Sequence, residues 1–113
     1  MITIEKLNDF GADTAEGLAR CCGMEALYLK LVNMIPAEGN FDKLAAAIEA
    51  DDLDAGFEAA HALKGVLGNL SLTPLYDKVS EITELLRART KMDYGPLVAD
   101  ILMKRDELTQ LCA

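Results

Sequence analysis

The chain contains a single histidine, His61, inside a stretch from Leu53 to Leu70 whose apolar residues recur at helical spacing. On a helical wheel of about 100° per residue, the small and apolar residues gather on the side opposite this histidine. We therefore expect the imidazole to point away from the core, where its nitrogens are accessible to a reaction partner. The residues of the expected core face are Gly56, Ala59, Ala60, Leu63, Val66, Leu67 and Leu70.

A lysine and two glycines accompany His61 on the same helix. Lys64 lies one turn later, where its ammonium group can stabilise an anion held on the imidazole. Gly65 and Gly68 lie on the exposed side, although glycine costs up to about 1 kcal/mol relative to alanine in a helix interior. Without side chains there, a flat partner surface can approach the helix closely. The pattern predicts a docking site for a large electrophile or for its carrier.

Phe57 lies one turn before His61, on the exposed half of the wheel, where a large aromatic side chain is unexpected. One explanation is packing at the seam with a neighbouring helix. The other is an apolar contact with a docking partner close to His61, since the cores of interfaces favour aromatic residues. Both explanations remain open from the sequence.

The few potential metal ligands argue against a metal site. A structural zinc site needs four ligands of the Cys or His type at characteristic spacings, whereas Cys21 and Cys22 are adjacent and Cys112 is distant. Three cysteines do not suit a disulfide framework, so we expect reduced thiols without an assigned role. The segment from Gly65 to Gly68 matches neither dinucleotide-binding nor P-loop patterns. We expect neither a metal nor a cofactor.

The elements that position these residues are predicted to be helices, because Ala and Leu are abundant and only 5% of residues are aromatic. Two short helices are expected near the N-terminus, one capped by Asp13 and one over residues 24–35. Four amphipathic helices of about 10–19 residues follow, joined by short loops. Their N-caps are expected at Asn40, Asp52, Thr73, and Asp93 or Gly95.

The simplest way to bury four such helices is an up-down four-helix bundle, with the two shorter N-terminal helices flanking one end. The fold class is therefore expected to be all-α. The 113 residues match the length of one domain, and 51% of them are hydrophobic. This fraction is sufficient for a hydrophobic core that needs no disulfide bond or structural metal ion. We expect a single domain over residues 1–113 and a monomer.

The charge balance excludes some partners. With 11 Lys and Arg against 19 Asp and Glu, the net charge is −8, which repels nucleic acid and anionic membranes. The first residues do not resemble a signal peptide, and no stretch approaches the roughly 20 apolar residues of a membrane span. We therefore expect a cytoplasmic protein that binds neither nucleic acid nor membrane.

The pentapeptide His61-Ala62-Leu63-Lys64-Gly65 resembles the H-x-L-K-G signature of histidine phosphotransfer (HPt) domains. By motif the resemblance extends over about residues 10–90. Ser71 departs from it, because many members have a glycine at this position, and the departure concerns the geometry of the turn there. The other residues that carry the resemblance are Leu18, Gly23, Leu27, Tyr28, Leu31, Asp52, Leu53, Ala60, Gly68, Asn69, Leu70 and Leu75.

The resemblance implies a phosphorelay intermediate with an HPt-like four-helix bundle. His61 would accept a phosphoryl group through Nε2 from an aspartyl phosphate of a receiver domain and pass it to another receiver aspartate. Lys64 would help to neutralise the phosphoryl charge, and Gly65 would leave room for the partner. The partners would be receiver domains or a hybrid histidine kinase. The domain would be a phosphocarrier and not an enzyme, since the receiver supplies Mg²⁺ and most of the charge stabilisation.

Two other functions compete with this interpretation. The chain could be a helical interaction module that docks on a receiver or kinase domain without phosphorylation, although the presence of both His61 and Lys64 argues against it. It could also be an enzyme that uses His61 as a general base. That chemistry needs a cleft and an orienting partner for the imidazole, which a convex helix face with glycines does not offer.

Overall fold

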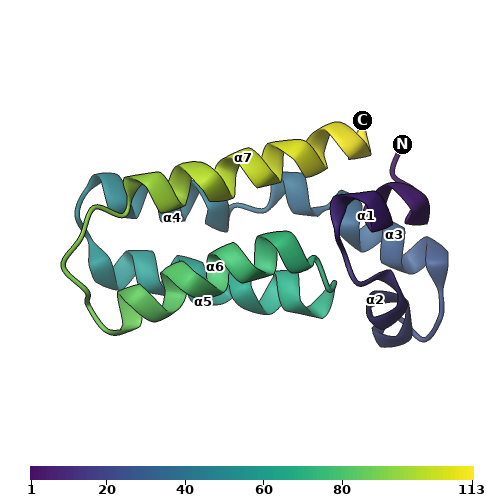
Figure 1. Ribbon diagram of the computed structural model, residues 1–113, viewed down its shortest axis with the longest axis horizontal. Coiled ribbons are helices and arrows are strands. Elements are labelled where there is room, and N and C mark those ends of the chain that lie inside the picture. Colours follow the sequence, from purple (N-terminus) through teal and green to yellow (C-terminus); the bar gives the residue numbers. More distant parts are fainter.

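The computed structural model describes residues 1–113 and contains helices but no strand. The chain forms seven α-helices and one short 3-10 helix (Figure 1), which confirms the all-α prediction. The elements in chain order are α1 (Ile4–Phe10), α2 (Thr14–Arg20), α3 (Glu25–Asn33), η1 (Ile35–Ala37), α4 (Asn40–Glu49), α5 (Leu53–Asn69), α6 (Thr73–Arg87) and α7 (Gly95–Cys112).

Helices α4 to α7 form the predicted four-helix bundle. Each packs against the next one along the chain, and α7 packs back against α4. In Figure 1, α4 and α7 lie in one layer and α5 and α6 in the other. The turns at residues 50–52 and 70–72 are too short for any arrangement except antiparallel neighbours. α5 packs against both α4 and α6, and the remaining part of its surface is exposed.

The core of the bundle consists of apolar side chains at helical spacing. Leu63 and Leu67 of α5, Val79 and Ile82 of α6 and Leu108 of α7 are completely buried. Burying a side chain of this size contributes about 1.5–3 kcal/mol relative to leaving it exposed. These stripes fix the rotation of each helix about its axis, and so determine which side chains of α5 face outward.

Three helices cover one end of the bundle where the sequence predicted two (Figure 1). The additional helix is α1, which begins after Thr3 and ends at Gly11. The side chain of Thr3 accepts a hydrogen bond of 3.1 Å from the third residue after it, and Gly11 has a φ of 105°. A Thr N-cap and a left-handed glycine are recognisable end signals. Because α1 has only seven residues, it is too short for an apolar periodicity to be detected in the sequence.

The predicted helix starts are partly correct. Asp13 and Asp52 are N-caps, and their carboxylates accept backbone N–H bonds of 3.2 and 3.1 Å. Asn40, Thr73 and Gly95 are instead the first residues of their helices, so those predicted caps are wrong by one position. Asp93, the other candidate for the start of α7, accepts a hydrogen bond of 2.9 Å from the N–H of Gly95, but Tyr94 occupies the N-cap position.

Four helices end at a left-handed residue that is not glycine. The φ angles are 56° at Cys22, 56° at Asp51, 52° at Ser71 and 52° at Arg89. After α5, the N–H of Ser71 donates to Gly68 and the next N–H donates to Leu67, both at 3.1 Å, which is the Schellman arrangement. A side chain in this conformation costs about 1–2 kcal/mol. The turn at Ser71 therefore has the geometry for which a glycine would be favoured.

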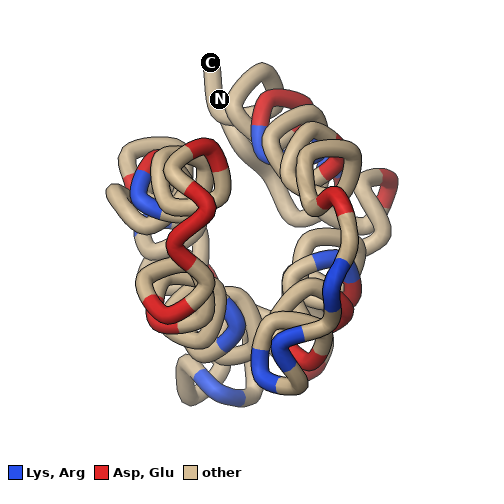
Figure 2. The backbone as a smooth tube through the Cα atoms, turned by 90° about the vertical axis from the view of Figure 1, so that its left-hand side faces the viewer, with Lys and Arg blue, Asp and Glu red and all other residues tan.

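Charged residues cover the outside of the bundle. Acidic segments lie on several sides of the end view, with basic segments between them (Figure 2). None of the helices combines the length and the apolar character needed to cross a membrane.

Candidate functional site

The site is built on α5, whose core face is the predicted one. Gly56, Ala59, Ala60, Leu63 and Leu67 are buried. Leu70, just past the helix end, is also buried, whereas Val66 is only half-buried. The imidazole of His61 is consequently exposed, as predicted. The periodicity of the apolar residues was sufficient to place this histidine on the outside because α5 has neighbours on one side only.

The imidazole of His61 stacks on the ring of Phe57, one turn earlier on α5. The ring centroids are 5.6 Å apart and the planes are inclined by 16°. Phe57 is half-buried and packs against the edge of the core. Its other neighbour is Arg87 of α6, whose guanidinium carbon lies 4.9 Å from the ring centroid. The explanation that places Phe57 at a helix seam is thus correct, and a contact with a partner stays a prediction.

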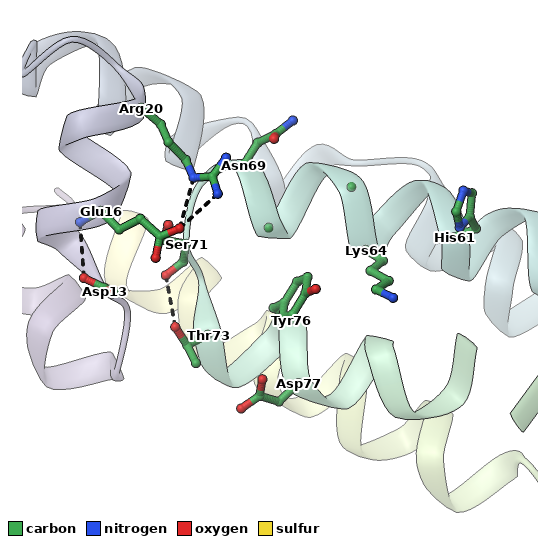
Figure 3. Close-up of a pocket in the computed structure, with 12 residues that line it drawn as sticks. Asp13, Glu16, Arg20, His61, Lys64, Asn69, Ser71, Thr73, Tyr76 and Asp77 are labelled. Atoms are coloured by element: carbon green, nitrogen blue, oxygen red, sulfur yellow. Dashed lines mark hydrogen bonds and ion pairs between the residues drawn. The ribbon is translucent and has the colours of Figure 1, made fainter. Parts of the chain in front are cut away.

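Lys64 is held on the flank of α5 by α6. Its Nζ lies 3.5 Å from Oε1 of Glu84, and its side chain is 29% exposed. Arg87 donates a hydrogen bond of 3.1 Å from Nε to Oε2 of the same carboxylate. This hydrogen bond lowers the pKa of Glu84, and the charges of Arg87 and Lys64 lower it further. In Figure 3, Lys64 and His61 leave α5 in different directions, so the ammonium group lies beside the imidazole and not over it.

The two glycines differ in their surroundings. A Cβ placed on Gly65 would meet no other atom within 4 Å, so the backbone beside His61 is open. A Cβ on Gly68 would lie 3.0 Å from Cε1 of Tyr76. Gly68 is half-covered, and its lack of a side chain makes room for the tyrosine. Gly68 therefore contributes to helix packing, and its part in partner docking stays a prediction.

An open groove of about 680 Å³ runs along α5 from His61 toward the N-terminal helices (Figure 3). One wall is α6, with Tyr76 and Asp77. The far wall is α2, where Arg20 and Glu16 form an ion pair with an Nη2–Oε1 distance of 2.9 Å. Apart from Tyr76, Gly65 and Gly68, the lining residues have charged or polar side chains. The groove thus joins His61 to residues outside the bundle.

The contribution of α2 to the groove was missed by the sequence analysis. Asp13, Glu16 and Arg20 are 41 or more positions before His61, and no periodicity relates residues of separate helices. The structure brings them together because α2 and α3 pack on the end of α5. The hydroxyl of the buried Tyr28 donates a hydrogen bond of 2.8 Å to the carbonyl of Leu70, and the N–H of Asp13 donates one of 3.0 Å to Ser71.

The cysteines and the potential metal ligands are the other residues with candidate chemistry. Cys21, Cys22 and Cys112 are unpaired, and burial raises the pKa of the Cys112 thiol. No group of three or more His, Cys, Asp or Glu side chains is arranged to hold a metal ion. The chemistry that the site offers is therefore that of an exposed imidazole with a lysine beside it.

Comparison with known families gives one match. The family model described as Hpt domain matches residues 36–113, which include α4 to α7 and both His61 and Lys64. Helices α1 to α3 lie before the matched residues, although the motif resemblance began near residue 10. No curated protein and no solved structure gives a significant match.

Proposed function

The chain belongs to the family of Hpt domains, which carry out histidine phosphotransfer in two-component signalling, and from this membership we propose that His61 is its phosphoryl acceptor. The observation that carries the proposal is the exposure of the only histidine on α5, within the segment matched by the family. An acceptor must be reached by a second protein, and a buried imidazole could not be.

The proposed reaction is a reversible transfer between a receiver aspartate and His61. The lone pair of Nε2 attacks the phosphorus of the aspartyl phosphate, a P–N bond forms, and the P–O bond to the aspartate breaks. The aspartate leaves as a carboxylate, and the imidazole retains its proton on Nδ1. In the reverse direction a second receiver aspartate attacks the phosphorus, and the neutral imidazole leaves. Passage from one receiver to another makes the chain a relay intermediate.

The catalytic groups of this reaction belong to the partner. Hpt domains are phosphocarriers and not catalysts. Phosphoryl transfer needs a metal ion and positioned charges around the equatorial oxygens, and we assign the Mg²⁺ and most of this stabilisation to the receiver. Lys64 adds a cation beside the phosphoryl group once its ammonium turns from Glu84 toward His61. The ion pair with Glu84, at 3.5 Å and partly exposed, is weak enough to allow this movement.

The docking surface that we propose is the groove together with the open backbone at Gly65. A standard interface covers about 800 Å² of each partner, a disc of roughly 16 Å radius. Asn69 follows His61 by eight residues, or about 12 Å along the axis of α5. A receiver centred on His61 therefore also covers the groove and reaches the Glu16–Arg20 pair on α2. We propose that Phe57 and Gly68 lie within the same footprint.

The remaining parts of the proposal concern the setting of the molecule. We propose that residues 1–113 act as one domain and as a monomer, and that receiver domains or a hybrid histidine kinase are the partners. The compartment of such partners is the cytoplasm. A domain that docks on them without accepting phosphate is the competing function, and the experiment below separates the two.

The test compares wild type with His61→Gln. A panel of receiver domains, phosphorylated with radiolabelled acetyl phosphate, is incubated with each protein, and acid-labile label on the chain is measured. We expect label on the wild type and none on His61→Gln, with unfolding free energies within about 0.5 kcal/mol because the site is exposed. Glu58→Gln, an exposed change one turn from His61, is the matched control and should be labelled normally.

Equal labelling of wild type and His61→Gln contradicts the assignment of the acceptor. Receiver binding by both proteins without label on either supports the competing function, a docking module without phosphotransfer.

A further inference from the structure

Three side chains from two helices form a series of contacts at the site, which we call the column: Arg87 of α6, Phe57 of α5 and His61 of α5. The guanidinium lies 4.9 Å from the centroid of the phenyl ring, and the phenyl and imidazole centroids are 5.6 Å apart. No hydrogen bond within the chain engages the imidazole, so the stacked ring is the neighbour that can limit its rotation. The column suggests a function for Phe57 that concerns His61 itself.

The geometry of the ring pair is that of an offset stack. Residues four positions apart lie on one face of a helix, one above the other. Planes inclined by 16° with centroids 5.6 Å apart agree with the preferred offset arrangement of aromatic pairs. Phe57 is half-buried and packed against the core, whereas His61 is exposed. The packed phenyl ring of Phe57 can therefore restrict the rotation of the exposed imidazole of His61.

Arg87 is the member of the column that comes from α6. A guanidinium is attracted to the negative face of an aromatic ring, and this attraction holds the phenyl ring in its plane. Arg87 is itself fixed by the hydrogen bond of 3.1 Å from its Nε to Glu84. Glu84 also pairs with Lys64 at 3.5 Å. One continuous chain of contacts on α5 and α6 thus connects the side chains on either side of His61.

We propose that Phe57 and Arg87 are positioning residues, which hold the imidazole of His61 in the orientation that presents Nε2 to the phosphoryl donor. The proposal rests on the proposed function, because it assigns to these residues a part in the same transfer. An exposed histidine samples several rotamers, and attack on phosphorus succeeds only from those in line with the leaving group. Restricting the ring to them before the donor arrives increases the rate.

The test uses a donor too small to dock. Phosphoramidate reacts as a zwitterion: Nε2 attacks the phosphorus, a new P–N bond forms, the bond to the ammonium nitrogen breaks, and ammonia leaves. The rate with this donor depends on the imidazole and not on a protein interface. We compare Phe57→Leu, which keeps an apolar side chain at the seam, with Phe57→Tyr, which keeps the ring. NMR couplings of His61 give its rotamer populations without any donor.

We expect Phe57→Leu to slow phosphorylation by phosphoramidate about 2- to 10-fold, the range that corresponds to an aromatic pair. In Phe57→Leu the side chain of His61 should average over several rotamers. Phe57→Tyr should restore the rotamer populations of the wild type and bring the phosphorylation rate to within about twofold of it. Arg87→Gln should slow the reaction about twofold. Arg89→Gln removes the same charge two positions later from a residue that pairs with Asp54, and should leave the rate unchanged.

Three outcomes overturn the inference. Unchanged rotamers and an unchanged rate in Phe57→Leu remove the positioning function. A normal rate with phosphoramidate but weaker receiver binding makes Phe57 a docking residue instead. Equal rates for Arg87→Gln and Arg89→Gln exclude Arg87, and this exposed pair of variants stays informative if Phe57→Leu unfolds. Failure of the proposed function looks different: wild type takes no label from a receiver, while the rotamer measurement still reports on the column.

Discussion

The hydroxyl of Tyr28 and the carbonyl of Leu70 are joined by a hydrogen bond of 2.8 Å between residues 42 positions apart. Tyr28 is completely buried, and the bond attaches α3 to the residue that follows α5. Because α2 packs against α3, this attachment also sets the place of the Glu16–Arg20 pair at the far wall of the groove.

Replacement of Tyr28 by Phe tests this attachment. The change leaves the buried carbonyl of Leu70 without its phenol donor, and we expect a loss of about 1–2 kcal/mol in the free energy of unfolding. Burial, followed by the negative charges of Cys21 and Asp13, raises the pKa of Tyr28 to about 12. The native state thus retains the phenol proton more tightly than the unfolded chain, whose tyrosine pKa is about 10.

The sign of the pH dependence follows from that difference. The contribution of the Tyr28 proton is complete below about pH 10 and declines as the pH rises toward 12. Urea unfolding at pH 7 and pH 11 should therefore show a smaller difference between wild type and Tyr28→Phe at the higher pH. A difference that grows with pH would contradict the assignment.

Gly17→Ala should destabilise the same region by steric conflict. A Cβ on Gly17 would lie 2.6 Å from the Cε1 and Cζ atoms of Tyr28, a rigid and buried ring that cannot move aside. Overpacking of this kind costs about 1–3 kcal/mol. Gly65→Ala is the matched control on an open helix surface, where alanine should instead stabilise by up to about 1 kcal/mol. Thermal unfolding of both variants gives the comparison.

Gly65→Gln should obstruct docking while leaving the fold intact. The longer side chain projects from the open backbone beside His61 into the space of the partner. We expect receiver affinity to fall by about 1–3 kcal/mol, measured by titration calorimetry. Gly39→Gln places the same side chain at another position with no neighbouring atoms, and its affinity should match that of the wild type. Normal receiver binding and phosphotransfer by Gly65→Gln would contradict the proposal that Gly65 leaves room for the partner.

Lys64→Ala should slow phosphotransfer and shorten the lifetime of the phosphorylated form without abolishing either. The ammonium group is partly solvated, so its effect on a neighbouring phosphoryl group is limited to about 1–2 kcal/mol. Single-turnover transfer from a phosphorylated receiver and the decay of the purified phosphoprotein measure the two effects. Complete loss of transfer would assign Lys64 a larger part than the one proposed.

Ser71→Gly should stabilise the chain. Ser71 has a φ of 52°, and its buried hydroxyl has no hydrogen-bond partner. Glycine removes both the strained Cβ and the unsatisfied oxygen, so we expect a gain of about 1–2 kcal/mol in a denaturant titration. Asp51→Gly changes an equally left-handed residue that is exposed, and it should gain less because no buried polar atom is removed.

The sequence was sufficient to predict features that depend on the residues of a single helix. The exposure of His61 followed from residues within two turns of it on α5, and the caps at Asp13 and Asp52 followed from local hydrogen bonding. The departure at Ser71 was visible too, although its left-handed φ was not, because helix ends at residues other than glycine carry no clear local signal.

Contacts between helices were beyond the sequence. Nothing local to Gly68 shows that Tyr76 lies over it, or that Glu84 pairs with Lys64. The same holds for the approach of α2 to the end of α5, which depends on a buried phenol of α3. These relationships depend on the register between helices, and a helical period determines which side is buried but not which neighbour covers it.

The polar lining of the groove has a consequence for how long a partner stays. Tyr76 is the one large apolar side chain that lines the groove, so the groove offers few apolar anchors, and bridging water can remain between the two surfaces. Because a few well-buried anchors supply most of the energy of an interface, a surface with few of them favours modest affinity. A complex with a dissociation constant of about 1 μM that forms at about 10⁶ M⁻¹s⁻¹ has a residence time of roughly one second. A relay carrier with such a surface releases one receiver in time to meet the next.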